Sequence, residues 1–436
     1  MKRLLLSILF LPNIIISQHT LSGEFTPAQD FTYAFLYHAT PSGTEYVDKA
    51  QLDDNGKFNM TLDSIHNPGI YKIVYAIPAE ENNFDFIYNG KESVAFTFDL
   101  ESGLEFTDSN ENKLWTSYIK SMDMVNRTLS NYYIQESTDR QAYMEIIKTM
   151  ADTQRAYEEN SKGMLTEGLV KANKPYIPSQ YEDLSTYAGN LKSNYLTHVD
   201  FSNTLLQSSD FLIERVLAYI FGMSANTSNA SYRQNVDTLM ESIGDDNLKI
   251  KTMLFQIIWQ QFKQMDNTEM TNYVADTYLF ELANQTNQTE LIEEITAYKN
   301  TAVGNKAPNF DLQISKDGGV VNTSLHDLYL NNTYLLIFWS SSCSHCLDEL
   351  PQIKSYLTNH PEVSVIAFGM EDEGSEWEEL IKQFPDFIHV LGVGKWDNPT
   401  SNLYGVEATP TYFILDKDKN IIAKPYDLKA LKAFFK

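Results

Sequence analysis

The chain has 436 residues, with 33 Lys and Arg against 58 Asp and Glu, which gives a net charge of −25. This excess of acid excludes a general nucleic-acid binder and argues against docking on an anionic lipid surface, because both need clustered basic side chains. With 43% hydrophobic residues, the chain can bury several cores, and its length predicts about three domains. Only two cysteines are present, which excludes a disulfide-stapled scaffold and a four-thiolate metal site.

Residues 1–17 are typical of a secretory signal peptide. Lys2 and Arg3 precede an apolar run over residues 4–16, and the small residue Ser17 follows it. A buried strand or a membrane anchor is the alternative, but the run is shorter than the ~20 apolar residues of a spanning helix and contains Pro12. We therefore expect cleavage near Ser17 and an exported mature chain without a membrane span. In an oxidising compartment, a lone cysteine pair is expected to cycle between dithiol and disulfide.

Residues 18–108 have the pattern of short strands. Aromatic and β-favouring residues dominate 31–37, the turn sequence Asp-Asp-Asn-Gly occupies 53–56, and apolar and polar residues alternate over 58–62. Turns that recur about every ten residues favour a small antiparallel β-sandwich as an accessory domain.

Residues 109–300 change to a helical period. Leu114, Tyr118, Met122 and Val125 recur at three to four residues, and similar stripes follow. This region predicts roughly seven helices in an all-α accessory domain. It contains no cofactor motif, and we expect no cofactor.

Residues 301–436 have the pattern of an α/β domain. Residues 334–339 form a continuous apolar run, as expected of a strand buried on both faces, and 347–357 carry a helical stripe. Further apolar stretches at 363–368 and 411–415 predict strands, so the expected order is β-α-β-α-β-β-α.

The two cysteines lie where the first of these strands ends and a helix begins. At this junction, free backbone N–H groups and the helix dipole stabilise a thiolate at Cys343. Cys346 is one turn further on, within reach for a disulfide, and a charged His345 would favour the thiolate and destabilise the disulfide. Glu349 lies three residues after Cys346 on the same helix face. It is a candidate base for the thiol of Cys346.

Two prolines accompany the cysteines. Pro410 stands at the head of the strand 411–415, where a cis peptide bond after Thr409 is expected. The loop would then lie beside the cysteines and offer backbone groups to an extended substrate. Pro351 is expected to kink the helix that carries the cysteines.

These residues together resemble the TlpA/ResA-type thiol-disulfide oxidoreductases of the thioredoxin superfamily. The resemblance covers about residues 302–436, and it is carried by Val303–Phe310, Phe338-Trp339, Cys343–Cys346, Glu349, Pro351 and Thr409-Pro410. It implies an α/β thioredoxin fold over 301–436, catalysis by Cys343 and Cys346 with help from Glu349 and His345, and substrate contacts at Thr409, Pro410 and Trp339. It also implies export to the periplasm or cell envelope of a Gram-negative bacterium, with protein thiols and disulfides as partners and a membrane electron donor of the thiol type.

Two positions depart from the family pattern. Ser342 replaces the usual Trp, and His345 replaces the usual Pro and is similar to the more oxidising members of the superfamily, which leaves the direction of electron flow open. Other interpretations are half of a zinc site, a peroxidatic cysteine, an ordinary exposed carboxylate at Glu349 and a solvent-facing spacer at His345.

The sequence thus predicts an exported protein-disulfide oxidoreductase that exchanges the Cys343–Cys346 pair with protein substrates as a reductase. The alternative is an envelope module that binds a peptide, polymer or partner protein under control of the redox state of the cysteines. No metal or nucleic acid is expected in either case.

Overall fold

The computed structural model describes residues 19–62, 66–223, 227–316, 319–373 and 375–436. The predicted signal peptide, residues 1–17, lies outside the described residues. The chain forms two compact units, one up to residue 274 and one from residue 275 onward. This division falls inside the region 109–300, so its last two helices belong to the C-terminal unit. The expected domain boundaries near 108 and 300 stay predictions.

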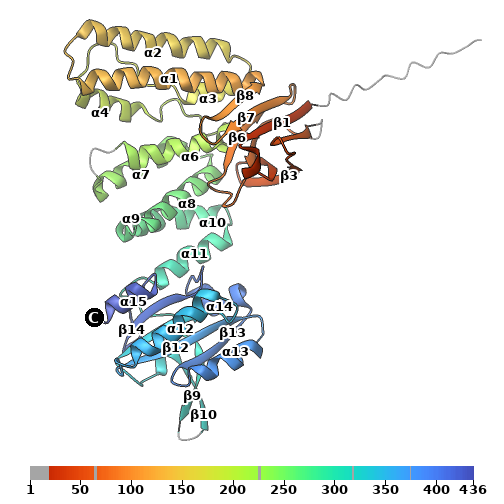
Figure 1. The fold of residues 1–436 in the computed structure, drawn as a ribbon. Coiled ribbons are helices and arrows are strands. Elements are labelled where there is room, and N and C mark those ends of the chain that lie inside the picture. Colours follow the sequence, from red (N-terminus) through yellow and green to blue (C-terminus); the bar gives the residue numbers. More distant parts are fainter. Residues whose placement is uncertain (1–18, 63–65, 224–226, 317–318, 374) are drawn as a thin grey trace, which may run out of the picture. The chain divides into compact units, whose positions relative to one another are not determined.

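The first unit begins with two four-stranded sheets, ordered β4-β1-β7-β8 and β3-β2-β5-β6 (Figure 1). The strands are β1 (His19–Thr26), β2 (Tyr33–Thr40), β3 (Gly43–Gln51), β4 (Lys57–Leu62), β5 (Gly69–Val74), β6 (Asn83–Tyr88), β7 (Val94–Asp99) and β8 (Gly103–Asp108). The predicted sandwich is confirmed, but it is not wholly antiparallel, because β1 and β7 pair in parallel. Between β1 and β7 the chain forms the strands of the other sheet, β2, β3, β5 and β6. This long connection allows β7 to run in the same direction as β1.

The inner faces of both sheets share one core rich in aromatic rings. Leu21 and Phe25 of β1 pack there with Leu36 of β2 and Phe96 of β7, all buried. Gly23 permits this packing, because a Cβ atom at that position would lie only 2.4 Å from the Phe58 ring and 2.5 Å from the Phe96 ring. Close approach of rings to the backbone thus requires glycine on β1.

Helices fill the rest of the first unit. They are α1 (Asn110–Ile134), α2 (Arg140–Asn160), α3 (Thr166–Ala172), α4 (Leu184–Asn194), α5 (Thr204–Gln207), α6 (Asp210–Leu217), α7 (Asn229–Ile243), α8 (Leu248–Gln264) and α9 (Thr268–Val274). Ser109 and Asp139 cap the N-termini of α1 and α2, accepting hydrogen bonds from first-turn backbone N–H groups. The described residues contain more helices than the seven expected, because short helices such as α3 and α5 are too brief to show a period.

The second unit contains α10 (Phe280–Gln285), α11 (Thr289–Asn300) and a five-stranded mixed sheet. The sheet order is β13-β12-β11-β14-β15, with β11 parallel to β12, β12 parallel to β13, and β14 antiparallel to both of its neighbours. The strands are β11 (Thr333–Trp339), β12 (Val363–Glu371), β13 (Ile388–Val393), β14 (Thr411–Asp416) and β15 (Ile421–Ala423), and the helices are α12 (Ser344–Leu357), α13 (Ser375–Leu380), α14 (Pro399–Leu403) and α15 (Leu428–Phe434).

The central strand β11 is buried on both faces, as its continuous apolar run predicts. Leu335, Ile337 and Trp339 share a core with Cys346 of α12, and the alternate residues, including Leu336 and Phe338, pack on the other side of the sheet. The expected α/β order is confirmed but incomplete. It lacked β13, α14 and the hairpin of β9 (Asp311–Lys316) and β10 (Gly319–Ser324), which are short and carry polar or glycine residues that hide the strand pattern.

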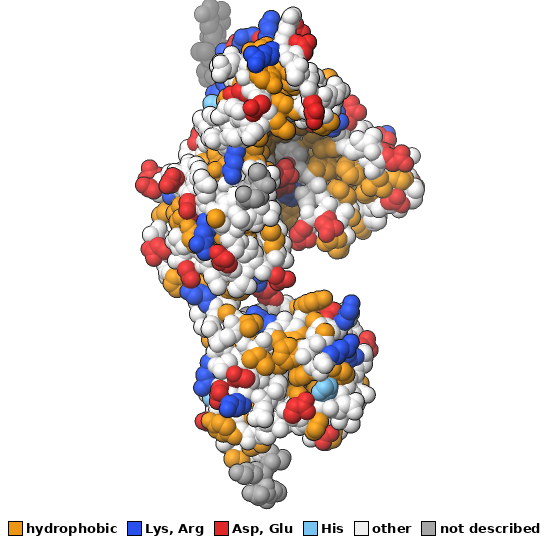
Figure 2. All heavy atoms as spheres, turned by 90° about the vertical axis from the view of Figure 1, so that its left-hand side faces the viewer, with side chains coloured by type: hydrophobic (Ala, Val, Ile, Leu, Met, Phe, Trp, Pro, Cys, Tyr) orange, Lys and Arg blue, Asp and Glu red, His pale blue; other side chains and the backbone are white. Residues whose placement is uncertain are grey.

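Acidic side chains are spread over the face of the molecule shown in Figure 2, with scattered basic ones between them. No helix in the described part of the chain is long and apolar enough to cross a membrane.

Candidate active site at the first turn of helix α12

Cys343 is the N-cap residue of α12, directly after the loop that follows β11. Its backbone is extended, and its sulfur accepts a hydrogen bond from the backbone N–H of Cys346 at 3.2 Å. The Cys343 side chain is partly exposed, whereas Cys346 is fully buried. Both are free thiols, and their Sγ atoms lie 2.6 Å apart. The structure therefore brings together one accessible and one buried sulfur at the positive end of a helix dipole.

A buried carboxylate holds the loop in front of Cys343. Glu371, the last residue of β12, is only 3% exposed, and it accepts hydrogen bonds from the Ser341 backbone N–H at 2.6 Å and the Ser341 hydroxyl at 2.8 Å. The backbone N–H of Cys343 donates in turn to the Ser340 carbonyl at 3.1 Å. These bonds fix the chain between the strand and the first cysteine.

The loop before β14 forms the other side of the site. The Thr409–Pro410 peptide bond is cis, as the sequence predicts. The Cys343 thiol donates a hydrogen bond to the Thr409 carbonyl at 3.3 Å. Both Thr409 and Pro410 are partly exposed. Residues about 66 positions apart in the sequence thus meet at one sulfur atom.

Glu349 lies on α12, three residues after Cys346. It is partly buried and accepts a hydrogen bond from the hydroxyl of Tyr412. Tyr412 belongs to β14 and is 2% exposed. Burial first, and then the bond to Glu349, raise the pKa of the Tyr412 hydroxyl, so it remains a proton donor at neutral pH. Negative charge on either cysteine also raises the pKa of the Tyr412 hydroxyl. Glu349 is therefore an oriented carboxylate and not a free surface group.

Burial raises the pKa of the Cys346 thiol, and its hydrogen bond with Cys343 adds to the shift. Hydrogen bonds from the Ser340 backbone and the Thr409 side chain favour the thiolate but offset burial only in part. Cys346 therefore needs a base to become a nucleophile.

Two other candidate residues occupy different surroundings. His345 is exposed on the first turn of α12, and no described residue forms a hydrogen bond or ion pair with it. Trp339 is fully buried, in the same core as Cys346. The expectation that Trp339 contacts substrate is therefore wrong, because β11 directs its side chain into the protein interior, where it supports the site from below. Pro351 lies inside α12, as predicted.

Sequence reasoning missed Tyr412 and Glu371. Tyr412 belongs to the strand pattern 411–415, which gives no hint that its hydroxyl reaches Glu349. Glu371 ends a buried strand parallel to β11, and an acidic residue at that strand end is the signal that could have placed it near the cysteine loop. Within the described residues, no group of three or more His, Cys, Asp or Glu side chains is arranged to hold a metal ion.

The unequal burial of the two thiols predicts their order of alkylation. In the reduced protein at pH 7, iodoacetamide should modify Cys343 and leave Cys346 unmodified, because Cys346 is inaccessible and its pKa is raised. Peptide mapping by mass spectrometry would measure both sites, with urea-unfolded protein as the control in which both react. Preferential modification of Cys346 in the folded protein would contradict this arrangement.

Comparison with known proteins agrees with this fold. A family model described as thioredoxin-like matches residues 331–421, a minor part of the chain that includes both cysteines. Comparison with curated proteins gave no significant match.

Among solved structures, a thioredoxin-like protein from Bacteroides caccae is 18% identical and covers 60% of this chain and 96% of its own, with a TM-score of 0.39. The thioredoxin domain of a thiol-disulfide oxidoreductase from Bacteroides vulgatus is 22% identical and covers 31% of this chain and 95% of its own, with a TM-score of 0.26. A thiol-disulfide oxidoreductase from Bacteroides fragilis is 21% identical, at 30% and 96% coverage and a TM-score of 0.25. On the evidence of its own sheet order and the matched family model, the C-terminal part of this chain is a thioredoxin-like domain of the thioredoxin superfamily.

Proposed function

We propose that this protein is an exported thiol-disulfide oxidoreductase that reduces disulfide bonds in protein substrates. The observation that carries the proposal is the pair of adjacent sulfur atoms at the start of α12, one accessible and one buried, beside the Thr409 carbonyl. This arrangement supplies the attacking thiol, the resolving thiol and a backbone edge for substrate in one place.

In the first step, the Cys343 thiolate attacks one sulfur of a substrate disulfide. The substrate S–S bond breaks, a mixed disulfide forms between Cys343 and the substrate, and the other substrate sulfur leaves as a thiolate that takes up a proton. The N-terminal N–H groups of α12 favour the negative charge on Cys343 before the attack. The Thr409–Pro410 loop provides backbone groups against which an extended substrate segment can lie.

In the second step, Cys346 gives its proton to Glu349 and attacks the Cys343 sulfur. The mixed disulfide breaks, the second substrate thiol is released, and a Cys343–Cys346 disulfide remains, so two electrons have passed to the substrate. Tyr412 acts as a positioning residue, because its hydrogen bond orients the Glu349 carboxylate. A membrane donor of the thiol type would return the protein to its dithiol form. The alternative of a redox-gated binding module stays a prediction.

Single cysteine variants test the two roles. Cys343→Ser should abolish turnover of a protein disulfide, whereas Cys346→Ser should accumulate a mixed disulfide, because attack occurs but resolution does not. Non-reducing electrophoresis with reduced and oxidised substrate would show the trapped species. Ser342→Ala, next to Cys343, is the matched control and should keep turnover. Full activity of Cys343→Ser would refute the proposal.

The direction of electron flow is decided by the reduction potential of the Cys343–Cys346 pair. For a reductase we expect a value near the ~−270 mV of thioredoxin, measured against a glutathione series. A value between about −180 and −120 mV would instead indicate an oxidase or isomerase, with His345 as the expected cause. In that case, His345→Pro should shift the potential to a more reducing value.

Loss of the oriented carboxylate should slow resolution specifically. Glu349→Gln should leave the first attack unchanged and slow release of the second thiol about 10²- to 10⁴-fold at pH 7, with the rate rising as hydroxide replaces the missing base. Tyr412→Phe should show a smaller defect of the same kind, since the carboxylate remains but is less well oriented. Stopped-flow measurement of mixed-disulfide decay separates the two steps. Equal decay rates in wild type and Glu349→Gln would remove this residue from the mechanism.

A further inference from the structure

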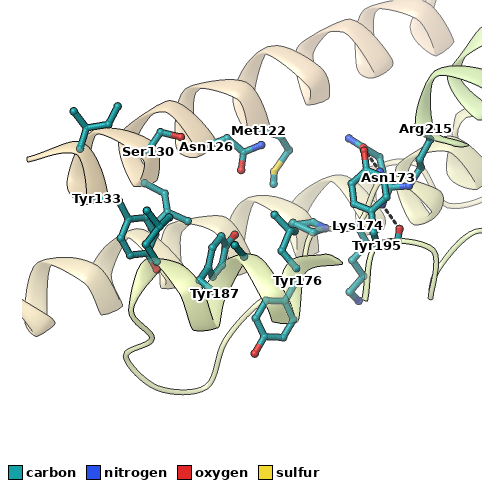
Figure 3. A pocket seen from close by; sticks show the side chains of 16 residues that line it. Met122, Asn126, Ser130, Tyr133, Asn173, Lys174, Tyr176, Tyr187, Tyr195 and Arg215 are labelled. Carbon is teal, nitrogen blue, oxygen red and sulfur yellow. Dashed lines mark hydrogen bonds between the residues drawn. The ribbon is translucent and has the colours of Figure 1, made fainter. Parts of the chain in front are cut away.

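The first unit contains a cavity of about 610 Å³ that lies away from the cysteines in sequence and is built from the helical region. Residues of α1, the segment 173–176, α4 and α6 line it, and Figure 3 shows Tyr133 at one end of the group and Arg215 at the other. This volume is in the range of pockets that hold small organic molecules.

The walls of the cavity are largely aromatic and aliphatic. Tyr133 and Tyr187 pack with ring centroids 5.8 Å apart, and Tyr176 and Tyr187 lie 5.9 Å apart. Leu129 and Leu191 add aliphatic surface. The Tyr133 hydroxyl donates to the backbone carbonyl of Glu182, and the Tyr176 hydroxyl donates to its carboxylate. Both hydroxyls are therefore bonded to the protein, and the rings remain as the surface offered to a ligand. Such walls favour an apolar or aromatic body.

Arg215 is the charged group at the other end. It is 7% exposed, and its guanidinium donates to the Asn173 side-chain oxygen at 3.0 Å and to the Tyr195 carbonyl at 2.7 Å. The guanidinium carbon also lies 4.0 Å from the centre of the Tyr195 ring. All of these partners are neutral, and Nε has no hydrogen-bond partner in the structure.

Across the described ranges, no carboxylate forms an ion pair with Arg215. Burial lowers its pKa, but a guanidinium remains charged at neutral pH. Lys174, which also lines the cavity, differs in this respect because it pairs with Glu158 at 3.1 Å. A buried cation without a counter-ion costs several kcal/mol in general, and the lack of a counter-ion stands out in a chain with 58 acidic residues.

We propose that this cavity binds a small organic anion, a carboxylate with an aromatic or aliphatic body, with its carboxylate directed toward Arg215. Such a ligand supplies the missing negative charge and covers the apolar walls in one binding event. Arg215 has five N–H donors and uses two of them on protein acceptors, so donors remain for a carboxylate. This site is independent of the cysteine chemistry proposed above.

The test compares an acid with its neutral counterpart. The full mature chain is titrated by isothermal calorimetry with 4-phenylbutyrate and with 4-phenyl-1-butanol, and a shorter and a longer arylalkanoate check the fit of length. We expect at least one acid to bind about tenfold or more tightly than the matched alcohol, because a hydrogen bond to a charged group outweighs a neutral one.

Three variants assign the binding to this cavity. Arg215→Met replaces the charged side chain with an apolar one of similar length and should remove the preference for the acid. Ala188 lines the cavity, so Ala188→Trp should occupy part of it, leave Arg215 intact and weaken the binding of both probes. Arg127→Met, at an exposed arginine of α1 paired with Asp123, is the matched control and should leave both affinities unchanged. Far-ultraviolet circular dichroism confirms that each variant is folded.

The proposal is overturned if none of the acids binds at millimolar concentration, or if acid and alcohol bind equally to the wild type. It is also overturned if Ala188→Trp, folded, binds the acid as the wild type does. If Arg215→Met does not fold, Ala188→Trp and the acid–alcohol comparison still decide the matter.

Discussion

The site depends on the junction between a fully buried strand and the first turn of a helix. β11 is covered on both faces, and this packing places the residue that follows its loop where α12 begins. Cys343 occupies this N-cap position, which satisfies one of the free N–H groups of the helix with a sulfur atom and directs the dipole of the helix at it. Every other feature of the site is arranged around that sulfur.

The two thiols differ although they are one turn apart. The N-cap position leaves Cys343 partly exposed, while the helix turn directs Cys346 into the core beside Trp339. Burial raises the pKa of the Cys346 thiol and keeps it protonated at neutral pH, so the two thiols differ in reactivity as well as in exposure. Glu349, which we propose as the base for Cys346, accepts a hydrogen bond from the hydroxyl of Tyr412.

Buried charges in this protein follow two different patterns. Glu371 is almost fully buried, but both of its oxygens accept hydrogen bonds from Ser341, so its burial stiffens the loop before the cysteines. Arg215 is similarly buried and its partners are also neutral groups, but its Nε atom has no hydrogen-bond partner in the structure. A buried charge whose polar atoms all have hydrogen-bond partners holds the structure in place, whereas a buried charge with donors left over can be stabilised further by an anionic ligand.

Local pattern alone determined the β-rich, helical and α/β regions, since the apolar period is 2 in half-buried strands and 3.6 in helices. The spacing of Cys343 and Cys346 and the proline at 410 also marked the site, because one helical turn and one strand start are short-range features. Only the tertiary structure placed Tyr412 against Glu349, buried Trp339 and left Arg215 without a counter-ion among the residues that the structure describes. These facts depend on which sheet face or helix side meets which partner, and contacts between residues far apart in sequence leave no periodic signal.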